Sequence, residues 1–271
     1  MSDRVVTQAL CWRVERGDGV MVALTDHDRD LVVDGILHRA APGMTPSAVV
    51  RGEGLEADTM EVTGALGAAA FRRDDLVAGR WDGARVVMNA VDWGDPARAA
   101  VPLGEGRIGE VELTAEGFTA EMRGAQARLE RPVTEATSPA CRAMLGDARC
   151  RVAMAPRRRF ARVLACVDER VTIAAGGDPP GPVDDAYGEG VLRWFGGGNT
   201  GLTSAIERSV GAVLTLRAPP VFAVAAGTLV EVSEGCDRRL ATCATRFGNV
   251  ANFRGEPFLP GIDLLTRYPG G

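Results

Sequence analysis

The chain has 271 residues, of which 46% are hydrophobic and 25% are charged, so it is long enough for one large or two modest globular domains with a sizeable core. The formal net charge is −5, which excludes a global positive charge that would attract nucleic acids or acidic membranes. All 31 basic residues are arginine.

The first residues do not read as a targeting segment. Met1 to Arg4 lead directly into strand-like sequence, without the apolar run of a secretory signal. No stretch of the chain approaches the roughly 20 apolar residues of a membrane-spanning helix, so we expect no membrane anchor. We therefore expect synthesis in a reducing compartment, where cysteines more often bind metals or act in catalysis than form disulfides.

The first half of the chain is predicted to consist of short strands. Apolar runs at 5–14 and 20–24 flank a Gly-Asp-Gly turn, and two shorter runs flank Asp34-Gly35, so each pair predicts a β-hairpin. Such regularly spaced strands with glycine turns are typical of a barrel or a sandwich. Further strands are expected near 48–50, 55–64, 84–93, 106–112 and 117–123.

One short helix interrupts these strands. It is predicted over 72–78, because Asp74 and Asp75 would lie near its N-terminus, where acidic side chains suit the helix dipole. Gly79 would end the helix. The Arg131-Pro132 region is the candidate domain boundary, which gives domains of 1–131 and 132–271.

The second half is also predicted to be rich in strands. The runs 160–166 and 171–174 indicate a hairpin that turns at Asp168–Arg170. Later strands are expected at 191–195, 203–210, 212–216 and 228–232. The loop G-G-G-N-T-G after Trp194-Phe195 lacks the Lys-Ser/Thr end of a phosphate-binding P-loop, so we interpret it as a hairpin turn.

Two pairs of cysteines stand out in the second half. Cys141 and Cys150 are spaced C-x8-C, and Cys236 and Cys243 are spaced C-x6-C. Four thiolates can satisfy a tetrahedral zinc ion or an iron–sulfur cluster, although these spacings match neither a zinc ribbon nor the ferredoxin run. A helix over 240–243 would bring Cys236 and Cys243 to one side. The alternative is four unrelated buried thiols.

The remaining candidates have simpler interpretations. Cys11 and Cys166 lie inside apolar strands and are expected to be buried structural thiols. The motif T-D-H-D-R-D-L places acids at alternate positions but lacks the glycine and glutamate of an EF-hand, so a polar turn is expected. The run Arg157–Arg159 could contact DNA or a neighbouring subunit, but a solvated turn before the next strand is the preferred interpretation.

Several motifs resemble a conserved family of phage tail proteins that includes the hub protein of gene transfer agents. The resemblance covers nearly the whole chain. One departure is Glu256, where the family pattern favours an aromatic or apolar residue. The motifs that show it are T-D-H-D-R-D-L, D-L-V-A-G-R-W-D-G-A-R-V, V-D-W-G-D-P, S-P-A-C-R-A-M-L-G-D-A-R-C-R-V and G-C-D-R-R-L-A-T-C-A-T-R-F-G-N-V-A-N-F-R-G-E-P-F-L-P-G.

The cysteine spacing is also similar to that of the phage lambda tail tip protein, which has an iron–sulfur cluster in its C-terminal domain. This resemblance implies that Cys141, Cys150, Cys236 and Cys243 bind a [4Fe-4S] cluster, with zinc as the alternative. The implied fold is mainly β, with a tail-hub β-barrel-like domain over 1–131 and a β-rich iron–sulfur domain over 132–271.

The resemblance also implies a structural role rather than catalysis. The protein would be made in the bacterial cytoplasm and assembled, as a homotrimer, into the tail of a phage or gene transfer agent particle. It would link the distal tail ring to the central fibre or tip protein and line a channel that DNA passes through without sequence-specific binding. The alternative is a cysteine-ligated metalloenzyme, such as a zinc hydrolase or a redox enzyme. Four cysteines close a mononuclear site, which counts against catalysis.

Overall fold

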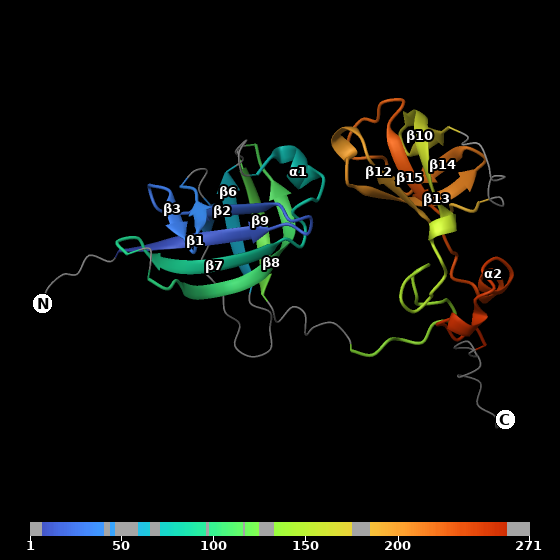
Figure 1. Cartoon of the computed structure of the whole chain (residues 1–271), viewed down its shortest axis with the longest axis horizontal. Coiled ribbons are helices and arrows are strands. Elements are labelled where there is room, and N and C mark those ends of the chain that lie inside the picture. Colours follow the sequence, from blue (N-terminus) through green and yellow to red (C-terminus); the bar gives the residue numbers. More distant parts are fainter. Residues whose placement is uncertain are drawn as a thin grey trace, which may run out of the picture. The chain divides into compact units, whose positions relative to one another are not determined.

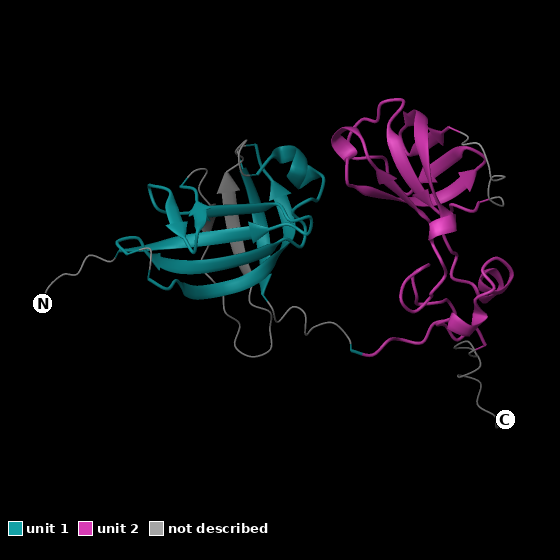
Figure 2. Ribbon diagram, in the orientation of Figure 1, with its two compact units in different colours: residues 1–133 teal, residues 134–271 magenta. Residues whose placement is uncertain are grey.

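The computed structural model describes residues 7–40, 44–46, 59–65, 71–95, 98–115, 117–124, 133–174 and 185–258. The chain divides into two compact units, 1–133 and 134–271 (Figure 2). The predicted boundary at Arg131-Pro132 lies outside the described residues. Strands dominate both units, which confirms the prediction of a mainly β protein.

The first unit is built on a seven-stranded sheet with the strand order β2-β1-β7-β8-β9-β6-β5, in which all neighbours are antiparallel (Figure 1). A separate two-stranded hairpin, β3-β4, follows β2. The strands of this unit are β1 (Gln8–Glu15), β2 (Met21–Thr25), β3 (Leu31–Val33), β4 (Ile36–His38), β5 (Met44–Pro46), β6 (Thr59–Ala65), β7 (Arg85–Asp92), β8 (Val101–Leu113) and β9 (Gly117–Gly124).

The local signals of the first unit predicted its turns well. Asp34 and Gly35, between β3 and β4, have positive φ angles of 51° and 76°, as a tight two-residue hairpin turn requires. Helix α1 (Arg73–Val77) confirms the predicted helix and has Asp74 and Asp75 in its first turn. Gly79 follows it with a φ of 65°, a conformation that favours glycine.

The first unit has one main apolar core, formed where alternate strand residues face the same side of the sheet. Its largest fully buried side chains are aromatic and lie close together. The ring centroids of Phe71 and Trp81 are 4.7 Å apart, and those of Phe71 and Phe118 are 5.0 Å apart. The core contains Trp12, Val14, Leu24, Phe71, Leu76, Trp81, Ala84, Val86, Met88, Ile108, Phe118, Ala120 and Met122.

The second unit contains a closed barrel of six antiparallel strands, ordered β10-β11-β14-β13-β12-β15. The sequence predicted a barrel-like first domain, but among the described strands the closed ring lies in the second unit. Closure depends on the pairing of β10 with β15, which are far apart in the sequence and so leave no local signal. The strands are β10 (Arg158–Val167), β11 (Arg170–Ile173), β12 (Val191–Trp194), β13 (Thr203–Val210), β14 (Val213–Leu216) and β15 (Leu229–Ser233).

The inside of the barrel is filled by apolar side chains. Trp194 is fully buried there, and its indole N–H donates to Ser204 Oγ at 2.9 Å. The predicted turn after β12 is confirmed: the short 3-10 helix η3 (Gly197–Asn199) joins β12 to its hairpin partner β13. The core contains Ala161, Val163, Val171, Ile173, Tyr187, Leu192, Trp194, Ile206, Leu214, Leu216, Val230 and Val232.

The segment that precedes β10 and the segment that follows β15 form a loop-rich region. We call it the cysteine lobe (residues 134–157 and 234–258). Its described regular elements are short: the 3-10 helices η2 (Ala155–Arg157) and η4 (Val250–Asn252), and helix α2 (Leu240–Thr245) (Figure 1). Both segments leave the barrel together, because Arg158 of β10 pairs with Ser233 of β15. The barrel thereby holds the two cysteine-containing segments next to each other.

Candidate metal centre

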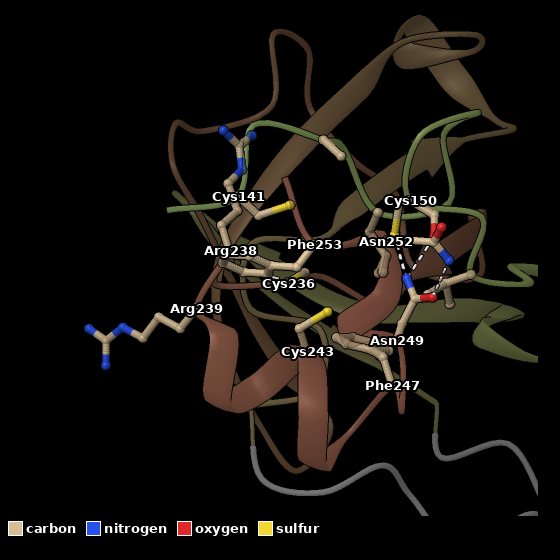
Figure 3. Close-up of a pocket in the computed structure, with 13 residues that line it drawn as sticks. Cys141, Cys150, Cys236, Arg238, Arg239, Cys243, Phe247, Asn249, Asn252 and Phe253 are labelled. Atoms are coloured by element: carbon tan, nitrogen blue, oxygen red, sulfur yellow. Dashed lines mark hydrogen bonds between the residues drawn. The ribbon is translucent and has the colours of Figure 1, made fainter. Parts of the chain in front are cut away.

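The four cysteines singled out from the sequence line one pocket of the cysteine lobe (Figure 3). Cys141 and Cys150 come from the first segment, and Cys236 and Cys243 come from the second. None of the four is in a disulfide. The other lining residues are Ala143, Leu145, Val152, Arg238, Arg239, Phe247, Asn249, Asn252 and Phe253.

The thiols influence one another electrostatically. Burial raises the pKa of Cys243, and the neighbouring thiols Cys236, Cys141 and Cys150 raise it further. Burial also raises the pKa of Cys236, which is affected by Cys141 and Cys150 as well. Four thiolates this close repel one another, so full ionisation of the set requires a compensating positive charge.

The first pair is positioned by backbone hydrogen bonds and one carboxylate. Cys141 N donates to Arg238 O at 2.9 Å, which ties the first segment to the second. Asp147 Oδ1 accepts from Cys150 N at 2.6 Å and from Arg149 N at 2.9 Å. Asp147 therefore shapes the turn that presents Cys150, and these hydrogen bonds lower the pKa of its carboxyl.

Cys236 and Cys243, the second cysteine pair, reach the pocket for a different reason from the one predicted. Helix α2 begins at Leu240 and contains Cys243, but Cys236 lies before the helix. Helical spacing therefore does not align Cys236 with Cys243, contrary to the prediction, although the two thiols do line the same pocket. Arg238 has a φ of 61°, and its N–H points at Cys236 Sγ at 3.4 Å. This left-handed turn, rather than helical periodicity, directs Cys236 to the pocket.

Glycine is required immediately before the second pair. A Cβ atom at Gly235 would collide with the carbonyl oxygen of Gly188. The backbone of Gly235 also donates from its N–H to Ala186 O at 3.1 Å. The G-C-D sequence thus lets the chain pass close to the 186–190 turn as it leaves β15 and enters the lobe.

Glu256, the departure from the family pattern, closes the lobe. Its carboxylate accepts two hydrogen bonds from Arg142, at 2.5 and 2.7 Å, and one from Ser138 N at 2.9 Å. Arg142 and then the Ser138 N–H lower the pKa of Glu256 to about 2. Sequence reasoning gave this residue no role. It fastens the end of the described chain onto the segment that contains Cys141.

A second ion-paired group lies at the base of the lobe, next to the first rung of the barrel. Glu234 Oε2 lies 2.7 Å from both Arg157 Nη1 and Arg246 Nη2. Arg246 also donates to Ala186 O at 2.7 Å, and both guanidinium groups lie over the ring of Phe247. The predicted solvated turn at the arginine run is therefore wrong for Arg157, which is partly buried in this junction.

The other sequence candidates have structural roles. Cys11 is buried in β1 and donates to Thr25 Oγ1, whereas Cys166 packs against the barrel core. In the T-D-H-D-R-D-L motif, Asp26 accepts from Leu10 N at 2.7 Å and Asp30 accepts from Ala40 N at 2.9 Å. These carboxylates fix backbone turns, as expected for a polar turn between strands.

The donor set of the pocket fits a sulfur-bound metal group. The described lining residues supply four thiols and no histidine, aspartate or glutamate. Thiolates favour zinc and iron–sulfur clusters over magnesium or calcium. Within the described ranges, however, no three His, Cys, Asp or Glu side chains are gathered closely enough to hold one metal ion.

Comparisons with known proteins give consistent matches. Residues 1–153 match a family model described as "Baseplate hub protein, N-terminal attachment domain". Residues 185–263 match "Phage conserved hypothetical protein BR0599". A solved chain described as "Virion of native gene transfer agent (GTA) particle" is 36% identical, with a TM-score of 0.85 over 98% of this chain and 92% of that one.

Comparison with curated protein sequences gives no significant match. In the described part of the chain, no helix has the length and apolar character needed to cross a membrane.

Proposed function

Because the chain belongs to the phage baseplate hub protein family, we propose that it is the hub that links the distal ring of a phage-like tail to the central fibre or tip protein. As a family member it is a structural component of a phage-like tail, assembled with other tail proteins. The observation that supports the hub role most strongly is the attachment-domain match over residues 1–153, together with similarity to a virion chain over 98% of the sequence.

In this proposal the two units have different tasks. The first unit attaches the protein to the ring, in keeping with the description of its family model. The second unit faces the fibre or tip protein, and three copies surround the channel through which DNA leaves. The net charge of −5 suits such a channel, because a strongly basic lining would hold the phosphate backbone.

The four cysteine thiolates hold a [4Fe-4S] cluster in this proposal, and the cluster fastens the lobe. When bound, such a group joins four chain positions through metal–sulfur bonds, so its binding free energy becomes folding free energy. Zinc at the same thiols is the alternative.

The hub role can be tested with the full-length protein. Purified chain would be analysed for mass in solution and mixed separately with the distal tail protein and the tip protein of the same particle. A hub forms a trimer and captures both partners. A stable monomer that captures neither would contradict the proposal.

The metal centre can be tested by anaerobic purification with iron, sulfide and zinc analysis. About four irons with matching sulfide per chain would support the cluster, and the variants Cys141→Ser, Cys150→Ser, Cys236→Ser and Cys243→Ser should lose it. Cys166→Ser is the matched control, because this thiol belongs to the barrel. One zinc per chain would change the metal but keep the site. Metal-free parent protein would overturn the proposal.

The metalloenzyme alternative gains no support from the pocket. The described residues that line it include no carboxylate or imidazole that could act as a general acid or base. Four thiolate ligands would also leave a single metal without an open position for substrate. We therefore propose no catalytic function.

A further inference from the structure

N–H groups point at the sulfur atoms of the pocket. Arg254 N donates to Cys141 Sγ at 3.3 Å, and Arg238 N donates to Cys236 Sγ at 3.4 Å. Both donors are backbone groups, so the fold of the chain supplies them whatever side chains occupy these positions. Such hydrogen bonds stabilise negative charge on a thiolate.

Asn249 contacts the other two cysteines. Its side-chain Nδ2 lies 3.6 Å from Cys150 Sγ and donates to Cys150 O at 2.6 Å (Figure 3). Its backbone N–H donates to Cys243 O at 3.0 Å. Burial raises the pKa of the Cys243 thiol, and the Asn249 backbone N–H offsets a small part of that rise. One residue therefore contacts a cysteine from each pair.

The orientation of the Asn249 side chain is fixed by a neighbour. Asn252 Nδ2 donates to Asn249 Oδ1 at 2.7 Å, so the amide oxygen is engaged and the amide nitrogen faces Cys150. Asn249 lies immediately before η4, which places Asn252 within reach. In the described part of the chain, Asn249 is the one residue whose side chain hydrogen bonds to a pocket sulfur.

We propose that Asn249 is a positioning residue that fixes Cys150 relative to Cys243 and tunes the metal centre through its amide N–H···S bond. The inference rests on the proposed role of the four thiols as metal ligands. Groups that hydrogen bond to metal ligands hold those ligands in place, and their loss commonly lowers metal affinity by about 10- to 100-fold. Hydrogen bonds to the sulfurs also set the reduction potential of an iron–sulfur cluster.

The direction of each effect follows from charge. A reduced cluster is more negative than an oxidised one, so an N–H donor beside a thiolate favours the reduced form. Removing the Asn249 donor therefore lowers the reduction potential. Asn249→Asp should lower it further than Asn249→Leu, because aspartate replaces the donor with a negative charge at the same place. Asn249→Gln keeps an amide N–H and should lie closest to the parent.

The experiment uses the full-length protein, purified anaerobically, as parent, Asn249→Leu, Asn249→Asp and Asn249→Gln. Asn89→Asp, the same change in the first unit, is the matched control. Three quantities are measured: metal per chain, the half-time of metal loss to a chelator, and the reduction potential from a titration followed by electron paramagnetic resonance. Circular dichroism checks that each variant is folded.

The expected result is about 10-fold faster metal loss in Asn249→Leu and Asn249→Asp, with the order of potentials given above and no change in Asn89→Asp. If Asn249→Leu does not fold, Asn249→Asp and Asn249→Gln still test the order. A metal-containing parent whose Asn249 variants keep its metal retention and potential would overturn this inference alone. A metal-free parent would overturn the proposed centre and this inference together. If the parent contains zinc, which has no reduction potential to measure, faster metal loss in the Asn249 variants supports the inference and unchanged metal loss overturns it.

Discussion

The barrel and the cysteine lobe belong to one compact unit but are stabilised in opposite ways. The barrel surrounds twelve buried residues, including Trp194 and Leu214, within a closed ladder of backbone hydrogen bonds. In the described residues of the lobe, Ala143 and Cys243 are the buried hydrophobic residues. The lobe instead depends on ion pairs and on hydrogen bonds from side chain to backbone, and the metal group proposed at the four thiols would add to them.

This difference shows how a short segment can have a defined structure without a core. A helix as short as α2 is not stable in isolation, because helix nucleation is costly and little apolar surface is buried. Fixed points supplied by Arg142, Glu256 and Asn249 reduce the conformations open to the loops. A metal bound at the thiols would add the strongest of these fixed points.

We expect metal removal to have the largest effect, because it should unfold the lobe and leave the barrel folded. Without metal, or in Cys236→Ser, we expect the lobe to lose its structure while the barrel keeps its own, because the barrel core is independent of the thiols. Limited digestion with trypsin would show this as rapid cleavage at lobe arginines such as Arg142 and Arg239. Equal protection of the lobe in metal-free and metal-loaded protein would contradict the prediction. Cys166→Ser is the control.

A cavity in the barrel core should destabilise the barrel instead of the lobe. Leu214 is fully buried, and Leu214→Ala should lower the free energy of unfolding of the barrel by about 2–5 kcal/mol. Val213 precedes it on β14 and is 37% exposed, so Val213→Ala should have a much smaller effect. Denaturant unfolding followed by tryptophan fluorescence measures both. Similar losses of unfolding free energy in the two variants would show that burial in the core is not the main source of barrel stability.

A smaller effect is expected from the ion pair that closes the lobe. Glu256→Gln removes the negative charge facing Arg142 and should speed proteolysis of the lobe without changing the unfolding of the barrel. Glu189→Gln, which weakens a more exposed pair with Arg217, is the matched control and should have little effect. Unchanged proteolysis in Glu256→Gln would mean that the backbone hydrogen bonds to Ser138 and Arg254 hold the two segments of the lobe together without this ion pair.

The smallest expected effect concerns the first unit, which has its own core. Burial lowers the pKa of His38, so the unfolded chain binds this proton more readily than the folded chain. Stability should therefore fall as the pH drops below about 6.5, the ordinary histidine pKa, and the loss should level off below the folded-state pKa. Thermal unfolding between pH 7.5 and 5.5 should be less pH-dependent in His38→Gln, with a difference of no more than a few degrees. His27→Gln is the control, and a pH dependence reduced as much in that variant as in His38→Gln would contradict the assignment to His38.

Local signals accounted for much of the fold. The Asp34-Gly35 turn, the acids at the start of α1, and the alternating strands could all be predicted, because each depends on neighbours in sequence. The sequence predicted a barrel-like first domain, whereas among the described strands the closed ring lies in the second unit. Closure of this ring depends on the pairing of β10 with β15, which is set by packing of the whole core rather than by any local pattern.

The candidate site was predicted in part. Cysteine spacing and the family resemblance selected four thiols that do line one pocket, but the reason given for Cys236 was wrong because it lies before α2. Asn249 was present in the quoted motif without a role, since its contacts with Cys150 span 99 residues of sequence. The recurrence of asparagine at 249 and 252, shortly after a cysteine, was the available signal.

The junction between lobe and barrel also has a mechanical consequence. Both connections leave the same end of the β10–β15 pair, so a pull on the lobe would load one rung of the ladder at a time, starting at Arg158 and Ser233. Antiparallel strands loaded in this way separate like a zipper, with little resistance at each step. Glu234, which is bonded to Arg157 and Arg246, lies ahead of that first rung. The ion-paired junction would therefore bear tension before any barrel strand does.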